Sequence, residues 1–466
     1  MKPQVRLSLL IVLLLLVSLL GVTLTQARSS RHSTLSSAIN LSAANLPWHG
    51  EYVQKVDSPL DVGAYTSLAL NPVNNLAYIS YYDAYNGDLM LAHFAPNGSG
   101  NCGTDNNWFC ESIDQDGDVG RFSSIDLWSG SPSGYKIGIS YYDQTNRSFK
   151  FTSQTCTGYL CTLWNAVTID IPVFDYMSVG LYTSLKFTPE GTPVIAYQAI
   201  DANTNNNSLR YAVYVTDGGN CGEGSATGKW QCSVIDAGNG IGQYASLALT
   251  YDGSPYLAYY DAGAGNLKMA YYTGFADPDC FGNNGWVCPI LDSVGDVGLF
   301  ASITAQHSPS DELFRIAYYD KTNQQLKYYD ADFGSVVVDE MGSSLSPMSI
   351  SLDVDKDGSP VIAYQKIASE FSPPTLQIAR PYFVYTDTSF GNCGDVPPGY
   401  LFQYWRCSIL DNAGQYTEEA DFASLVIGPS GYASIAYSEY DSYLDATSLK
   451  FITQYSQTFL PLIAKP

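Results

Sequence analysis

Four aspartates are the first candidates for binding chemistry, because each follows a pair of tyrosines: Asp83, Asp143, Asp261 and Asp320. Carboxylates bind sugar hydroxyls and Ca²⁺, and tyrosine combines an apolar ring with a polar hydroxyl. An aspartate at a strand end more commonly caps a turn by accepting hydrogen bonds from nearby backbone N–H groups. The pattern therefore predicts either a ligand-binding set or a set of turn caps.

The chain repeats one segment several times, and the copies that lack the Tyr-Tyr-Asp sequence are a second source of candidates. Gln198 and Gln365 each follow a single tyrosine where the other copies have the second tyrosine. Two enlarged loops, 170–180 and 411–421, also bring in Tyr176 and Tyr416. Loops on a rigid scaffold commonly carry function, so we expect a binding site where the repeat is broken.

A calcium site is suggested by the run Asp353, Asp355 and Asp357, which is followed by glycine as in calcium-binding loops. The position where such a loop needs a glutamate holds Tyr364 instead. The run also stands at an A–B turn where other copies have Thr-Pro-Glu-Gly or Thr-Tyr-Asp-Gly, so the alternative is an ordinary turn. We therefore expect no cofactor unless this run binds calcium. The four histidines are scattered along the chain, so no Ser/His/Asp set for hydrolysis is visible.

The ten cysteines fall into five local pairs. Irregular spacing within the pairs and the lack of accompanying histidines argue against zinc. An even number of cysteines in an exported chain favours disulfides. The predicted pairs are Cys102 with Cys110, Cys156 with Cys161, Cys221 with Cys232, Cys280 with Cys288, and Cys393 with Cys407.

These residues belong to successive copies of a repeated segment and to the connections between the copies. The segment is clearest at residues 241–272 (IGQYASLALTYDGSPYLAYYDAGAGNLKMAYY). Seven copies occur, and the complete copies divide into four short strands separated by turn signals. The pattern predicts an all-β fold, a seven-bladed β-propeller of four-stranded blades. The seventh copy lacks a fourth strand, and a matching strand at 51–57 precedes the first copy. We therefore expect the N-terminal strand to complete the last blade.

A serine recurs in the first strand of every copy, and we interpret it as a small residue required where the innermost strands crowd together. These serines are Ser67, Ser124, Ser184, Ser246, Ser302, Ser349 and Ser424.

The N-terminus has Lys2 and Arg6 before a long apolar run, as in a secretory signal peptide. We predict a signal peptide at 1–27, a flexible linker at 28–46, the propeller at 47–455 and a C-terminal tail at 456–466. The alternative for the N-terminal apolar run, which is long for a signal peptide, is an uncleaved membrane anchor, and no other stretch could span a membrane. The net charge of −23 disfavours nucleic acid as a partner. We expect a secreted or cell-surface monomer that binds a glycan or a surface protein.

The repeats resemble those of secreted bacterial β-propellers loosely related to the sialidase-like superfamily, over roughly residues 47–455. The resemblance rests on the strand pattern, since the Ser-x-Asp-x-Gly-x-x-Trp box typical of sialidases is absent and the cysteine pairs take its place. Three functions follow as hypotheses. The first is a non-catalytic binding propeller for carbohydrate or cell-surface ligands. The second is a carbohydrate-active hydrolase or lyase, and the third is a structural surface protein.

Overall fold

The computed structural model describes residues 51–58, 61–131, 134–158, 160–222, 228–275, 277–282, 285–305, 314–342, 349–367, 373–383, 392–395, 403–412 and 417–454. The chain divides into two units, Met1–Pro47 and Trp48–Pro466, and every described residue belongs to the second. The predicted signal peptide, linker and C-terminal tail lie outside the described residues. Within the described ranges, no helix has the length and apolarity needed to cross a membrane.

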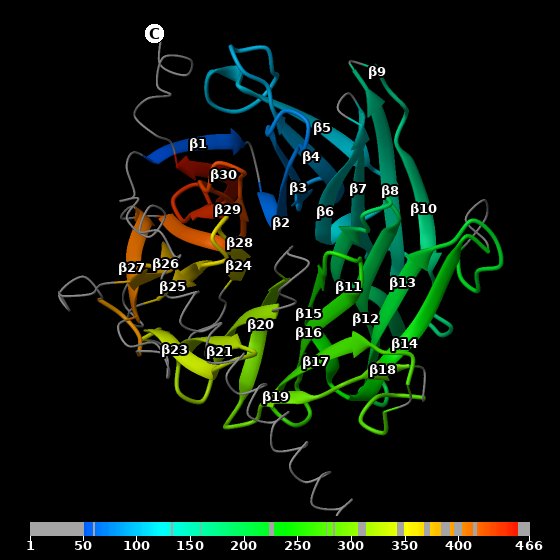
Figure 1. Ribbon diagram of the computed structural model, residues 1–466. Coiled ribbons are helices and arrows are strands. Elements are labelled where there is room, and N and C mark those ends of the chain that lie inside the picture. The colour runs from blue at the N-terminus through cyan, green and yellow to red at the C-terminus, as the bar shows by residue number, and fades with distance from the viewer. Residues whose placement is uncertain are drawn as a thin grey trace, which may run out of the picture. The chain divides into compact units, whose positions relative to one another are not determined.

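Seven antiparallel sheets make up the described part of the chain, and each is one blade, with strands named A to D from the inside outward (Figure 1). Blade one contains β2 (Val62–Leu70), β3 (Ala77–Asp83), β4 (Asp88–Phe94) and β5 (Trp108–Asp114), with a 3-10 turn η1 (Thr104–Asn106). Blade two contains β6 (Val119–Ser131), β7 (Gly134–Asp143), β8 (Ser148–Thr157) and β10 (Asn165–Asp170), with the short β9 (Leu160–Cys161) beside β8. Blade three contains β11 (Met177–Phe187), β12 (Pro193–Asp201), β13 (Asn206–Tyr214) and β14 (Trp230–Asn239).

The remaining blades follow the same order. Blade four contains β15 (Ile241–Leu249), β16 (Pro255–Asp261) and β17 (Asn266–Tyr272), with its D strand split into β18 (Trp286–Val287) and β19 (Ile290–Asp292). Blade five contains β20 (Val297–Ala305), β21 (Phe314–Asp320), β22 (Gln325–Asp330) and β23 (Gly334–Glu340). Blade six contains β24 (Ile350–Val354), β25 (Pro360–Lys366), β26 (Thr375–Phe383) and β27 (Gln403–Asn412). Blade seven contains β28 (Thr417–Ile427), β29 (Ala433–Asp441), β30 (Ala446–Gln454) and β1 (Glu51–Asp57).

The ring is closed by the N-terminal strand, as the sequence predicts. β1 pairs antiparallel with β30, from Glu51 opposite Gln454 to Asp57 opposite Leu449. In Figure 1 the blue β1 lies directly beside the red β30. The A strands contact one another in chain order, and β28 contacts β2 to complete the circle. Closure leaves no blade without a neighbour on either face.

The repeated serines do more than fill a small space between the inner strands. Each hydroxyl oxygen accepts a hydrogen bond from a backbone N–H in the A strand of the next blade, as Ser246 does from Ile303 at 3.1 Å. In blade six the prediction that Ser349 is the equivalent serine is wrong. Ser351 takes this place, because it pairs with Ala363 and its hydroxyl oxygen accepts the bond from the N–H of Leu425. The full set is Ser67, Ser124, Ser184, Ser246, Ser302, Ser351 and Ser424.

A glycine begins most A strands because the neighbouring blade comes too close for a side chain. A Cβ atom built on Gly120 would lie 2.8 Å from the Cα of Leu89, and one on Gly298 would lie 2.7 Å from the Cα of Leu267. Both glycines also have φ above +100°, which side-chain-bearing residues rarely adopt. The repeated Val-Gly dipeptide is therefore set by close packing of each A strand on the preceding C strand.

All five predicted disulfides are present, and each joins the two sides of a C–D connection. In three of these connections an asparagine beside the first cysteine exchanges two hydrogen bonds with the backbone of the second. Asn101, for example, accepts from the N–H of Cys110 and donates to its carbonyl. Asn220 and Asn392 do the same with Cys232 and Cys407.

We expect Ser246→Ala to destabilise the propeller by about 1–2 kcal/mol, because the N–H of Ile303 would lose its hydrogen-bond acceptor in a crowded site. Urea denaturation of the oxidised protein would measure the change. The matched control is Ser153→Ala, which removes a half-buried serine hydroxyl from a C strand outside this ring. Equal stabilities of the two variants would contradict a structural role for the repeated serines.

Candidate functional site on the loop face

The D–A loops and the B–C turns lie on the same face of the ring, as the repeat pattern predicts, and we call this the loop face. Backbone hydrogen bonds join them, from Ala84 to Asp61 and from Ala262 to Gly240, for example. Other bonds link B–C turns to the A strand of the next blade: the N–H of Val119 donates to the carbonyl of Gly87, and that of Val297 donates to the carbonyl of Gly265. In the described part of the loop face, these bonds tie neighbouring turns and loops to one another.

The four aspartates of the Tyr-Tyr-Asp sequences cap their own B–C turns. Asp83 accepts hydrogen bonds from the backbone N–H groups of Tyr85 and Asn86. Asp143, Asp261 and Asp320 accept from residues three positions later in the same way. Asp83, Asp143 and Asp320 are buried. This arrangement matches the turn-cap interpretation, and a ligand-binding role for the four stays a prediction.

The first tyrosine of each Tyr-Tyr-Asp sequence, and its equivalent in the three other blades, makes a polar contact with the preceding blade. Its ring is buried in strand B, and its hydroxyl donates to an aspartate at or near the end of strand D of the preceding blade, as Tyr259 does to Asp236 at 2.7 Å. Burial and the nearby carboxylate raise the pKa of Tyr259 far above its usual range. The seven pairs are Tyr81–Asp57, Tyr141–Asp114, Tyr197–Asp170, Tyr259–Asp236, Tyr318–Asp292, Tyr364–Asp339 and Tyr437–Asp411.

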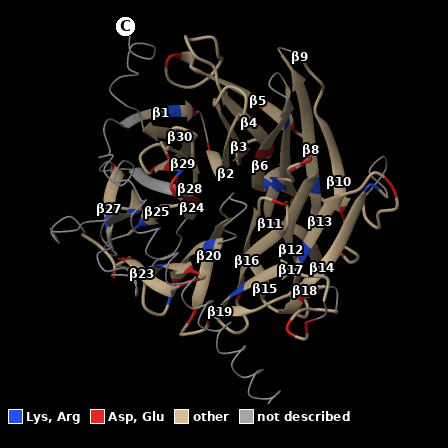
Figure 2. Cartoon of the chain, in the orientation of Figure 1, with Lys and Arg blue, Asp and Glu red and all other residues tan. Residues whose placement is uncertain are grey.

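Six of these seven aspartates also bind a lysine or arginine. The cations are Lys150, Arg210, Lys268, Lys327, Lys366 and Lys450. Figure 2 shows Lys and Arg as isolated blue segments on the drawn strands, not as a continuous band. The D-strand carboxylates that might have formed an acidic binding ring are instead used to hold neighbouring blades together.

The seventh aspartate, Asp57 at the ring closure, differs from the other six. Met90 lies opposite Tyr81, the position at which Lys150, Lys268, Lys327 and Lys450 lie opposite the tyrosines of their blades. Burial raises the pKa of Asp57, with the hydrogen bond from Tyr81 opposing the change. For Asp292 burial acts in the same direction, but bonds from Lys327 and Tyr318 outweigh it and the pKa is lowered.

The two predicted glutamines are interface residues. The amide of Gln198 donates to the carbonyl of Ile241 in the next blade at 2.7 Å, and Gln198 is buried. The amide of Gln365 donates to Asp421 of blade seven, also at 2.7 Å. Both hold adjacent A strands in place, and their proposed ligand contacts remain untested. Tyr416 lies outside the described residues.

The aspartates of the predicted calcium run have separate partners. Asp353 accepts from the N–H of Ile427 in blade seven, Asp355 caps its own turn, and Asp357 is exposed. Burial raises the pKa of Asp355. Among the described residues, the three side chains close enough to share a metal ion are Asp339, Cys393 and Cys407, and the cysteines are already joined as a disulfide. Calcium binding at the run therefore stays a prediction.

A row of aromatic rings along the A strands was not anticipated from the sequence. The rings stand two residues before the serines, have φ between +49° and +55°, and contact one another at 4.4–4.9 Å between centroids. Blade six has Ser349 at this position. The recurring aromatic-x-Ser spacing was the signal for this row. Its members, in order of contact, are Phe422, Tyr65, Phe122, Tyr182, Tyr244 and Phe300.

Tyr176 lies in a D–A loop that exposes several apolar side chains. Its ring stacks on Phe174 with centroids 5.2 Å apart and an angle of 9° between the planes. Phe174 is 54 % exposed and Tyr176 is 38 % exposed. Ile171 and Val173 of the same loop are also exposed.

The aromatic loop is bonded to a turn rich in side-chain amides. The N–H of Ala202 donates to the carbonyl of Tyr176 at 3.2 Å. Asn203, Thr204, Asn205 and Asn206 follow in this turn, and all are exposed. We call residues 171–176 and 201–206 the blade-three patch. It combines a flat pair of rings with amide and hydroxyl groups and with the exposed carboxylate of Asp175, and all of these can hydrogen-bond to a polyhydroxylated ligand.

No family model matches this chain, and no curated protein matches it. Several solved structures resemble it at low identity. The intramolecular trans-sialidase from Ruminococcus gnavus is 11 % identical, with a TM-score of 0.39, over 73 % of this chain and 95 % of that one. The polysaccharide lyase Uly1 is 9 % identical, with a TM-score of 0.42, over 83 % of this chain and 89 % of that one. The SapL1 lectin, solved with α-methyl fucoside, is 14 % identical, with a TM-score of 0.37, over 67 % and 92 %. Likeness of this degree carries no conclusion about the ligand or reaction of this chain.

We expect Met90→Lys to stabilise the protein by about 1 kcal/mol at neutral pH, by giving Asp57 the cation that the other six aspartates have. The pKa of Asp57 is raised in the folded state, so its ionisation lowers stability as the pH rises through that range. The stabilisation by the added lysine should therefore be larger at about pH 7 than at about pH 4. Urea denaturation at both values would measure it.

A lysine placed at the exposed Thr155 of β8 is the control for the added charge. An equal effect of Thr155→Lys, or a stabilisation by Met90→Lys that does not depend on pH, would contradict the role assigned to Asp57.

Proposed function

We propose that this protein is a non-catalytic, extracellular binding propeller whose ligand is a carbohydrate, held at the blade-three patch. The observation that carries the proposal is the exposed, stacked pair Phe174 and Tyr176. Solvent-exposed aromatic rings lose favourable burial unless a ligand covers them. The apolar C–H face of a sugar ring matches a flat aromatic surface of this size.

The neighbouring turn supports a ligand with many hydroxyl groups. Asp201 accepts bonds from the N–H groups of Asn203 and Thr204, which fixes the turn, and residues 202–206 are exposed. Asn205 also donates to the side chain of Asn239, the last residue of β14 in the same blade. Amide groups both donate and accept, so a fixed set of them can satisfy the hydroxyls of a neutral sugar.

Binding is favoured over catalysis by how the carboxylates are used. The aspartates at the D-strand ends are committed to tyrosine and lysine partners between blades, and the aspartates of the B–C turns cap those turns. A glycosidase needs two carboxyl groups facing one sugar across a gap. Hydrolase, lyase and structural functions are the alternatives that the experiment below separates from binding.

An extracellular location is supported by the five disulfides, which persist in oxidising compartments. The predicted signal peptide agrees with this location. A glycan on a cell surface, or a free polysaccharide, is the partner that we propose.

The test is affinity electrophoresis of the oxidised protein against a panel of polysaccharides, with and without calcium. We expect one or more polysaccharides to retard the wild type without new reducing ends or unsaturated products. The double variant Phe174→Ala/Tyr176→Ala should bind about tenfold more weakly, because stacking and buried area are both lost.

The control is Tyr85→Ala, which removes a tyrosine of blade one that is 68 % exposed. New reducing ends would support a hydrolase, and unsaturated products a lyase, and either would overturn the binding proposal. Absence of retardation by every polysaccharide would overturn carbohydrate as the ligand. Loss of retardation in the control to the same extent would remove the patch as the site.

A further inference from the structure

The exposed loop of the blade-three patch carries a carboxylate between its two rings. The N–H of Met177 donates to the carbonyl of Phe174 at 2.9 Å, so residues 174–177 form a tight turn with Asp175 and Tyr176 at its centre. Asp175 is exposed. Because consecutive Cα atoms are about 3.8 Å apart, a sugar that lies on the ring of Phe174 brings its hydroxyl groups close to Asp175.

The two carboxylates of the patch differ in whether the protein already uses them. Asp201 accepts from the N–H groups of Asn203 and Thr204 at 2.9 and 3.1 Å. Within the described ranges, no hydrogen bond or ion pair engages the side chain of Asp175. A carboxylate accepts through both oxygens, and its bonds from O–H donors are about twice as strong as bonds between neutral groups. Two neighbouring hydroxyls of one sugar can therefore donate to Asp175.

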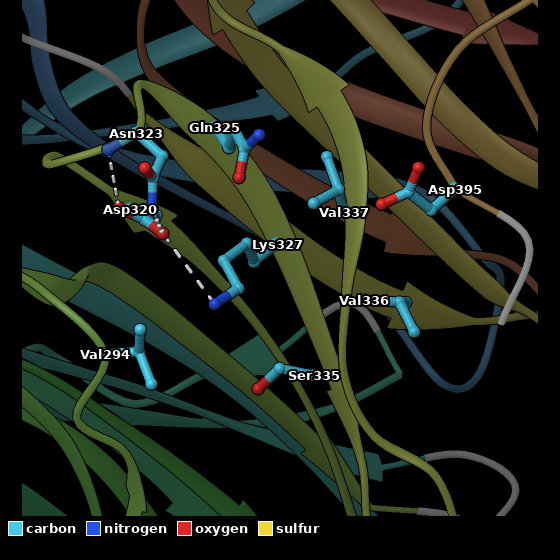
Figure 3. A pocket seen from close by; sticks show the side chains of 9 residues that line it. All are labelled: Val294, Asp320, Asn323, Gln325, Lys327, Ser335, Val336, Val337 and Asp395. Carbon is cyan, nitrogen blue, oxygen red and sulfur yellow. Dashed lines mark hydrogen bonds and ion pairs between the residues drawn. The ribbon is translucent and has the colours of Figure 1, made fainter. Parts of the chain in front are cut away.

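A carboxylate in the cavity of blade five shows the opposite case. This cavity of about 510 Å³ lies beside β23, where blade five has only the turn from Asp330 to Gly334 in place of the disulfide loops of blades four and six. Figure 3 shows Asp320 there, with its carboxylate facing Lys327 and Asn323. Asp320 is 1 % exposed, so its oxygens serve the protein and not a ligand.

The charge of the patch determines the class of glycan. The blade-three patch contains two aspartates and no lysine, arginine or histidine. Arg210 of the same blade is paired with Asp170 at 2.7 Å. Arg147 of blade two is exposed and its carbonyl accepts from the N–H of Val179 in β11, so one positive charge stands at the border. The two carboxylates outweigh it, and the whole chain carries −23, so a glycan with carboxylate or sulfate groups is repelled.

We propose that the ligand of the blade-three patch is a neutral polysaccharide and that Asp175 determines this specificity. Its carboxylate accepts hydrogen bonds from two adjacent hydroxyls of the sugar that covers Phe174. The same negative charge repels chains of uronic acids and sulfated sugars. The inference rests on the proposed carbohydrate binding and adds to it the class of glycan and the residue that selects it.

The test is affinity electrophoresis of the full oxidised protein, in EDTA, with neutral polysaccharides of the panel such as hydroxyethylcellulose, galactomannan and pullulan. Each is compared with a carboxymethylated polymer of the same backbone, so that the two differ in charge. We expect at least one neutral polymer to bind about two- to fivefold more tightly than its carboxymethylated counterpart at low salt. The difference should shrink as salt is added, because exposed charges are screened. Equal or tighter binding of the carboxymethylated polymers would overturn the proposal.

Asp175→Asn keeps the size of the side chain and removes its charge. Binding of the neutral polysaccharide should weaken about three- to tenfold, because charge-assisted hydrogen bonds are lost. The affinities for the neutral and the carboxymethylated polymer should also come closer together, because the repulsion is reduced. A residue that only held the loop in shape would weaken both and leave their ratio unchanged. The control Asp332→Asn removes an exposed carboxylate from the C–D turn of blade five and should change neither affinity.

The outcomes separate this inference from the proposal on which it rests. Unchanged affinities in Asp175→Asn, a loss of binding without a change in the ratio, or an equal change in the control would overturn the role of Asp175. Failure of every polysaccharide of the panel to retard the wild type would overturn carbohydrate binding and this inference with it. Retardation without a preference for neutral chains would overturn this inference alone.

Discussion

A tyrosine hydroxyl buried between each pair of blades, donating to an aspartate of the preceding blade, is the interaction on which the rest of the structure depends. A hydroxyl or a carboxylate buried alone is costly, so each requires the other at a fixed distance. The bond therefore sets how one D strand lies against the next B strand, and repetition of this spacing around the ring gives the closed circle. The loop face inherits its order from this packing, because the same strands end at its turns.

The repeat made most of the fold predictable from sequence. Strand order, the exchange at the ring closure and the five disulfides all follow from local patterns, and the structure confirms them. The tyrosine–aspartate pairs were missed although their spacing is nearly constant, at 23 to 27 residues. The assignment of Ser349 failed because blade six has no aromatic residue to mark the register, and the similar Ser351 stands two residues later.

The candidate sites were less predictable, because they depend on the direction in which each side chain points as well as on the residue type. Asp83 and its equivalents have the right chemistry for a ligand, but their carboxylates face their own turns. Tyr176 was identified as a departure from the repeat, whereas its stacking on Phe174 needed coordinates. The cavity of blade five comes from an omission, a connection shorter than its counterparts, and a sequence pattern does not show what a missing loop would have covered.

Because the first strand pairs with the last, the order of synthesis limits when the ring can close. β1 leaves the ribosome early, but its partner β30 follows only after six blades have been made. During that interval blade seven does not exist, and β1 has an unpaired edge that could join another chain. Six blades can form step by step from contacts between neighbours in sequence, whereas the seventh requires the two ends of the chain to meet. The closing step is therefore the one of highest contact order, and a nascent chain cannot reach the closed ring before β30 has been made.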